Sequence, residues 1–202
     1  SISFFKNLKI DLNANRNYSN NYSENYSVNN NFYESLNPNF YGNFSISSNM
    51  LRTSFNKKSM VQSGSFDRMK ENLKIISLRL INSKGIPNIE FDDQGFPIGF
   101  GKNSQEVLIP SFISAYTGKN VQDVSLNPIS DKPKINWSIQ YDGLSEAFND
   151  FFSRISFRHS YRSNFTINNF QSNLNYNENS FNSSGNSESK MFFSNINLVE
   201  QF

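Results

Sequence analysis

The sequence contains no cysteine and only one histidine among its 202 residues. The lack of cysteine excludes a disulfide scaffold, a thiolate metal site and a cysteine nucleophile. The single histidine, His159, lies in an alternating segment between Phe157 and Tyr161, which favours a packing role over that of a general base. Because no phosphate loop, carboxylate pair or metal-ligand spacing is present either, we expect no catalytic residue, no metal and no cofactor.

A strong charge of one sign and a long apolar run are also lacking. The formal net charge is +2, which does not indicate a nucleic-acid partner. No apolar run of about 18 residues occurs, so we predict no transmembrane helix, whereas the alternation of a membrane-spanning strand needs only about 10 residues. Aromatic residues make up 15% of the chain, which is more than a disordered chain carries. We therefore expect the chain to fold.

Residues 8–28 alternate in polarity with a period of two. Every odd-numbered residue from Lys9 to Ser27 is polar, whereas the even-numbered residues begin with three aliphatic side chains and continue to three tyrosines. Successive side chains of a β-strand point to opposite faces, so the pattern predicts an extended segment with one wholly polar face. The aliphatic residues are Leu8, Ile10 and Leu12, and the polar residues that alternate with and follow them include Asp11, Asn13 and Asn15.

Three further strands are predicted at 43–55, 155–167 and 191–199. In the second of these, the residues of one parity are apolar or aromatic, and those of the other parity are polar. The aromatic and aliphatic residues include Phe157, Tyr161, Phe165 and Ile167, and the polar residues include Ser156, Arg158, Ser160 and Arg162. Apolar residues then change parity at Phe170, which predicts a bulge or turn near Asn168. In 191–199 we expect Phe192, Ile196 and Leu198 to share a face. The polar stretch 177–190 is predicted to be the loop of a hairpin.

The middle of the sequence has helical rather than strand periodicity. Residues 65–81 predict an amphipathic helix with Ser65 as N-cap, ended by Gly85. A second helix is predicted over 104–117, capped by Asn103 and ended by Gly118, and a short third helix over 144–152. The predicted organisation is therefore strands in 1–58, a helical insertion in 59–133 and strands in 134–202.

Two architectures fit these strands. The apolar face covers a soluble core in the first, whereas in the second it contacts lipid and the polar face lines a wet lumen. Tyrosines near the strand ends, from Tyr18 to Tyr26 and at Tyr176, favour the aromatic girdle of a membrane protein. Alternation alone does not separate the two architectures.

Several segments resemble the SprA family, also called Sov. They are the run 99–118 (GFGKNSQEVLIPSFISAYTG), the run 134–145 (KINWSIQYDGLS), the strand 155–170, and residues 8–26 and 44–55. The family is the outer-membrane translocon of the type IX secretion system of Bacteroidota. The resemblance implies a mainly β fold, in which antiparallel strands form part of a large outer-membrane β-barrel with a small helical insertion as a cap or lumen element.

The resemblance also implies a function in protein export and gliding motility at the cell outer membrane. The implied partners are the lipid bilayer, a PorV-type outer-membrane protein, a periplasmic plug protein and the exported proteins. Family members are much longer, so we expect the chain to be a fragment, prone to aggregate through open edges when isolated. The predicted lumen-facing residues are Asp11, Asn13, Asn15, Ser156, Arg158, Ser160 and Arg162. The predicted lipid-facing residues are Leu8, Ile10, Leu12, Phe157, Tyr161, Phe165 and Ile167, with the faces exchanged if a strand packs against a helical cap on the lumen side.

Two other functions remain as alternatives. One is a different outer-membrane β-barrel transporter, such as a TonB-dependent receptor, although the sequence has no plug-domain pattern. The other is a secreted, Asn-rich β-sandwich that acts as an interaction module. An enzyme is the class that the sequence supports least.

Overall fold

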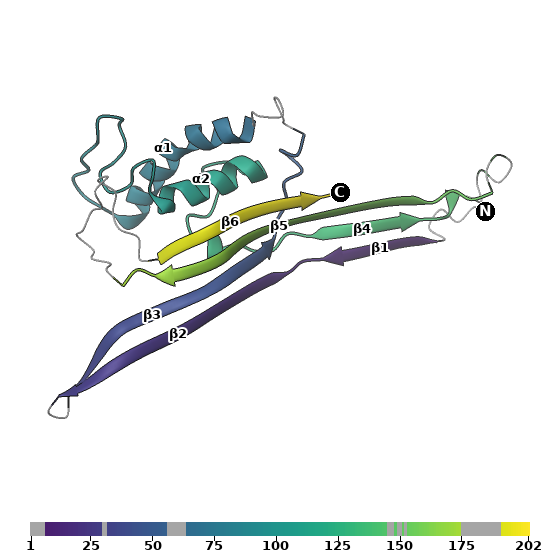
Figure 1. Ribbon diagram of the computed structural model, residues 1–202. Coiled ribbons are helices and arrows are strands. Elements are labelled where there is room, and N and C mark those ends of the chain that lie inside the picture. Colours follow the sequence, from purple (N-terminus) through teal and green to yellow (C-terminus); the bar gives the residue numbers. More distant parts are fainter. Residues whose placement is uncertain are drawn as a thin grey trace.

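The computed structural model describes residues 7–29, 32–55, 64–144, 148, 151, 153–174 and 191–202. Within these ranges one antiparallel sheet of six strands carries two α-helices and one short 3₁₀ helix on one of its faces (Figure 1). The predicted mainly β, antiparallel fold is confirmed, and the described sheet is open rather than closed into a barrel.

The six strands form four long rows. β1 (Leu8–Asn13) and β2 (Arg16–Asn29) follow each other along the first row. β3 (Phe32–Ser47) pairs with β2, and β4 (Asn136–Tyr141) pairs with β1, so these two strands together make the second row. The third row is β5 (Phe157–Ser172), which pairs with β4 and β3 on one edge and with the fourth row, β6 (Met191–Gln201), on the other. Each row thus lies beside the row that precedes it in the sequence.

The second row is interrupted where the helical part begins and ends. Ser47 N–H donates to the Asn15 carbonyl at 2.9 Å, and the Ser47 carbonyl accepts from Lys134 N–H at 2.9 Å. Ser48 N–H donates to the Ser163 carbonyl of β5 at 2.9 Å. These bonds join all three neighbouring rows at one point, so the chain leaves the sheet and returns to it at the same place.

One strand prediction needs correction in this region, and one stretch of pairing is new. The strand predicted at 43–55 ends at Ser47, because the chain then turns away from the sheet and Thr53 N–H donates to the Met50 carbonyl at 2.8 Å. The structure adds pairing over residues 32–42, which the sequence pattern does not predict. The extended segment predicted at 8–28 is confirmed as β1 and β2 with a short break between them.

The helical part consists of α1 (Gly64–Lys84), α2 (Gln105–Thr117) and the 3₁₀ helix η1 (Pro128–Ser130). The predicted ends are confirmed, since Gly85 and Gly118 adopt φ values of 62° and 67° that favour glycine. Both predicted N-caps are wrong. Ser65 lies inside the first turn of α1, and the N-cap of α2 is Ser104 rather than its neighbour. The helix predicted at 144–152 and the loop at 177–190 lie mainly or wholly outside the described residues.

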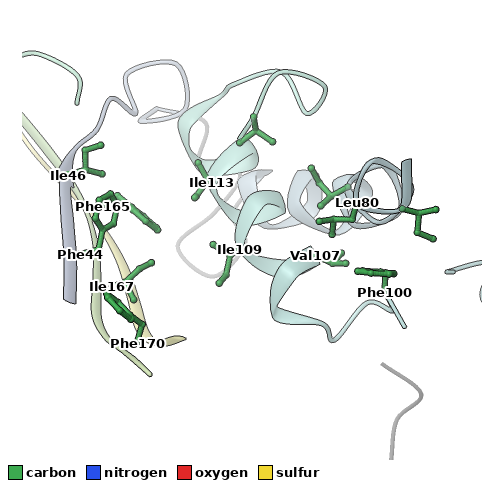
Figure 2. Packing of buried hydrophobic residues seen from close by; sticks show 13 residues of the cluster. Phe44, Ile46, Leu80, Phe100, Val107, Ile109, Ile113, Phe165, Ile167 and Phe170 are labelled. Carbon is green, nitrogen blue, oxygen red and sulfur yellow. The ribbon is translucent and has the colours of Figure 1, made fainter. Parts of the chain in front are cut away.

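The core has three layers, with α2 between the sheet and α1 (Figure 2). Ile109 and Ile113 of α2 point toward the apolar side chains of β3 and β5, whereas Val107 lies toward α1 and Phe100. α2 is therefore buried on nearly all sides, which explains its lack of a polar face. The sheet residues of this core are Phe44, Ile46, Phe165, Ile167 and Phe170.

The predicted bulge near Asn168 is confirmed. The pairing of β3 with β5 shifts register between Gly42, opposite Phe170, and Phe44, opposite Ile167, so both Ile167 and Phe170 face the core. β6 has a matching irregularity at Asn195, whose φ is 50°. For that reason Phe193, and not the predicted Phe192, packs on the core with Ile196 and Leu198.

Candidate functional site

One face of the sheet is polar along the half formed by β1, β4 and the start of β5. Asp11 pairs with Ser138, which in turn pairs with Ser160, so these three residues form a row across three strands. Directly paired residues share a face of an antiparallel sheet. Arg158 and Arg162 lie on the same face, exposed, on either side of Ser160. The structure therefore brings most of the predicted lumen-facing residues onto one surface.

Two of the predicted lumen-facing residues lie outside the strands. Asn15 lies between β1 and β2, and its backbone holds the interrupted row, since its N–H donates to Ser47 Oγ at 2.7 Å. Ser156 lies just before β5 and is exposed. Asn13, in contrast, ends β1 opposite Asn136 on the polar face.

The same polar face continues over β3 and β5 as a network of amides and hydroxyls. Asn164 Nδ2 donates to Ser45 Oγ at 2.8 Å and to Thr166 Oγ1 at 3.0 Å. These groups hydrogen-bond without carrying charge, so this part of the polar face is polar but neutral.

Basic residues and one carboxylate meet beyond the end of β4. Asp142 Oδ2 accepts from Gln140 Nε2 at 2.8 Å. Hydrogen bonds from Ser156 and Gln140, aided by the charges of Arg154 and Arg158, hold the pKa of the Asp142 carboxyl below its usual value. Asp142 is therefore ionised at neutral pH, and it offsets part of the positive charge at this end of the sheet.

The opposite, apolar face is partly exposed and partly covered. Ile10, Leu12 and Phe157 are exposed by 53%, 65% and 51%, and Leu8 is half-buried. The other three predicted lipid-facing residues, Tyr161, Phe165 and Ile167, are exposed by 0%, 4% and 0%. Phe165 and Ile167 belong to the core beneath α2, which corrects their lipid-facing assignment: the helical part covers them.

Tyr161 joins the edge of this covered region to the last strand. Its hydroxyl accepts from Met50 N–H at 2.7 Å and donates to Glu200 Oε1 at 2.8 Å. Ser54 Oγ donates to the same carboxylate oxygen at 2.6 Å. The ring stacks on Trp137 with centroids 4.6 Å apart. Tyr161 is thus a fixed structural group between the sheet and the 48–55 turn, which corrects its lipid-facing assignment too.

Aromatic side chains continue the apolar face along the hairpin of β2 and β3. Three ring contacts follow one another, with centroid distances of 4.8 to 6.2 Å. The pairs are Tyr18 with Phe170, Tyr22 with Phe40, and Tyr26 with Tyr33. Their tyrosines are exposed by 46% to 77%, so the stripe faces outward. The sequence pattern predicts the tyrosines of this stripe that lie on β2. Tyr176, the other tyrosine that the sequence places near a strand end, lies outside the described residues.

The described residues contain no group of three or more histidine, cysteine or acidic side chains that could hold a metal ion. The acidic stretch at 90–93 forms a turn, in which Asp92 Oδ1 accepts from the N–H groups of Gln94 and Phe96 at 2.9 and 2.8 Å. His159 is exposed, with its ring centroid 6.2 Å from that of Trp137. None of the helices in the described ranges is long and apolar enough to cross a membrane.

Comparison with protein-family models finds no matching family, and comparison with curated proteins finds no match. The resemblance to the SprA family therefore stays a prediction from the residues that carry it.

Proposed function

We propose that the chain forms part of the wall of a wide outer-membrane β-barrel that exports proteins from the periplasm to the cell surface, as in type IX secretion and gliding motility. The observation that carries the proposal is the four-row antiparallel meander with one polar face. Among the described residues, neither the β1–β2 edge nor the outer edge of β6 has a strand beside it. Successive neighbouring rows with two open edges are what a section of an up-and-down barrel wall presents.

We propose that the half of the sheet formed by β1, β4 and the start of β5 contacts lipid. Its apolar face, with Ile10, Leu12 and Phe157, is exposed, whereas α1 and α2 cover the next part of that face. The outer surface of α1 carries charged residues, which are costly in hydrocarbon, so the covered half lies beyond the membrane. The first row is too long to lie wholly within a membrane, because from residue 8 to 29 it spans about 70 Å, against a hydrocarbon core of about 30 Å.

The polar face would line the path of an exported polypeptide. Its amides and hydroxyls bond to water and to one another, so a passing chain meets no apolar surface that would retain it. Arg158 and Arg162 add a weakly basic strip. Selection on this surface is steric and electrostatic, and gating comes from partners, for which a PorV-type protein and a periplasmic plug are our proposals.

Cysteine labelling tests this proposal directly, because these 202 residues contain no cysteine that would react, and any cysteine elsewhere in the native polypeptide would first be replaced by serine. Single variants at Ile10, Asp11, Leu12 and Asn13 would be made in the native polypeptide, and outer membranes treated with a membrane-impermeant maleimide. We expect Asp11→Cys and Asn13→Cys to react, and Ile10→Cys and Leu12→Cys to react only with a lipid-soluble maleimide. Ile167→Cys is the control for a residue buried in protein and should resist both reagents until the protein is denatured.

Equal reaction of all four β1 variants with the impermeant reagent would refute lipid contact. An antibody against residues 64–120 adds an independent test on fractionated cells. We expect a band far larger than 23.3 kDa in the outer-membrane fraction, since a barrel needs more strands than these. A band of the chain's own mass in the soluble or secreted fraction would overturn the proposal.

One observation favours a second candidate, a secreted interaction module. The apolar face under α2 is packed as in a soluble protein with helices on one face of an antiparallel sheet, and the β2–β3 hairpin extends beyond the helices with its tyrosines exposed (Figure 1). Such a module would present the hairpin to a partner. In that case all four β1 cysteines would react with the impermeant reagent, and the band would be soluble.

A further inference from the structure

A pocket of about 350 Å³ opens where the helical part leaves the sheet and returns to it. Its walls come from the end of β3 with the turn that follows, from the end of α2, and from residues 131–134 before β4. Buried Ile46, Ile113 and Phe165 supply its apolar part. The pocket therefore borders both segments that connect the helical part to the sheet.

More cationic than anionic side chains line this pocket: Arg52, Lys119, Lys132 and Lys134 are present with the carboxylate of Asp131. Lys119 Nζ lies 3.1 Å from Asp131 Oδ2, so these two charges offset each other. Across the described ranges, neither Lys132 nor Lys134 forms an ion pair. Like charges around one small volume repel each other, and a bound anion would relieve that repulsion.

Other features of the pocket decide how strongly an anion is held. The C-terminal end of α2 at Thr117 presents the negative end of the helix dipole, which opposes an anion. The Thr117 hydroxyl is engaged with the Ile113 carbonyl at 2.6 Å and donates nothing to the pocket. Asn49 Oδ1 accepts from Leu51 N–H at 3.1 Å, which leaves the amide Nδ2 group of Asn49 as a neutral donor. The lysines must therefore supply most of the attraction.

We propose that this pocket binds a doubly charged oxyanion of the phosphate or sulfate type, held by Lys132 and Lys134 from one connecting segment and by Arg52 from the other. A dianion is favoured over a monoanion because Lys132 and Lys134 bring two positive charges that form no ion pair within the described ranges. The bound ion links the departing segment to the returning one and so fastens the helical part to the sheet. This inference does not depend on the proposed function, and a free ion and a phosphate headgroup of a lipid share the required chemistry.

The full chain in a neutral detergent would be titrated with inorganic phosphate at pH 8 and constant ionic strength, with the melting temperature and calorimetric heat as readouts. We expect saturable stabilisation by phosphate and by sulfate, and none by acetate. The double variant Lys132→Gln/Lys134→Gln should weaken binding about 25-fold, or about fivefold for each exposed lysine. The matched control Lys74→Gln/Lys102→Gln removes the same charge from exposed positions outside the pocket and should keep the wild-type affinity.

A second titration separates the two sources of the anion. Micelles containing phosphatidic acid, without free phosphate, should stabilise the chain through the same lysines if a lipid headgroup reaches the pocket. Stabilisation by free phosphate alone supports a soluble ion. Absence of saturable binding in either titration, equal stabilisation by acetate, or equal weakening by the control variant would overturn the proposal.

Discussion

The buried position of Ile167 gives the sharpest test of how the apolar face is used. Ile167 is fully buried between the sheet and α2, whereas Ile10, on the same face, is exposed by 53%. Ile167→Ala removes three carbon atoms, which costs about 2.4 kcal/mol in transfer free energy at about 0.8 kcal/mol each. The cavity of about 80 Å³ adds about 2 kcal/mol if the surroundings do not collapse. We expect the free energy of unfolding to fall by about 4 kcal/mol.

Urea unfolding followed by the fluorescence of Trp137 is a suitable assay, because Trp137 is the only tryptophan and lies in the sheet, stacked on Tyr161. Ile10→Ala is the matched control, with the same atoms removed from an exposed position. It should change the free energy of unfolding by less than about 0.5 kcal/mol. Equal losses at the two positions, or a loss below about 1 kcal/mol for Ile167→Ala, would refute the packing of α2 on this face.

Three further perturbations test separate contacts. A methyl group at Gly42 would clash with the Ser19 carbonyl oxygen, so Gly42→Ala should lower the free energy of unfolding by about 2 to 3 kcal/mol in the same urea assay. A decrease below about 0.5 kcal/mol would contradict the close approach of β2 and β3. Tyr161→Phe removes the hydroxyl that bridges the 48–55 turn and β6. We expect the free energy of unfolding to fall by about 1 to 2 kcal/mol and amide hydrogen exchange in β6 to become faster. Unchanged exchange would contradict the bridge. The folded-state pKa of Asp142 is lowered, so its stabilising contribution is present above the unfolded value of about 3.9 and is lost as the pH falls through the folded value. Carboxyl NMR titration should give a midpoint below that of Asp142 in the Ser156→Ala variant, and equal midpoints would exclude the Ser156 hydrogen bond as the main cause.

Local patterns in the sequence predict the parts of the fold that depend on neighbouring residues. The parity change between Ile167 and Phe170 predicts the bulge because side-chain direction in a strand has a period of two. Gly85 and Gly118 predict the helix ends because each adopts the left-handed conformation that other residues avoid. The polar face follows from the same alternation, and the structure adds only that its strands are neighbours.

What lies against the apolar face is not encoded in the alternation. The same pattern at Phe165 and Ile167 fits lipid, a second sheet or a helix, and only the long-range packing of α2 decides between them. The pairing at 32–42 escapes prediction because the register shift opposite Ser23 disrupts its alternation. The cationic pocket could not be predicted from the sequence, because Arg52 and Lys134 are far apart in the chain. They line the same pocket only because the chain leaves the sheet and returns to it at the same place.

The interrupted row also has a consequence for the order of folding. β2 and β3 are adjacent in sequence and can pair at once, but β4 joins their sheet only after residues 48–135 have been closed into a loop. Closing about 90 unstructured residues costs roughly 3 kcal/mol more than closing a tight turn. Prior folding of α1 and α2 would bring residues 47 and 134 together, where a hydrogen bond of 2.9 Å joins them, and would lower that cost in advance. We therefore expect α1 and α2 to fold before β4 joins the sheet.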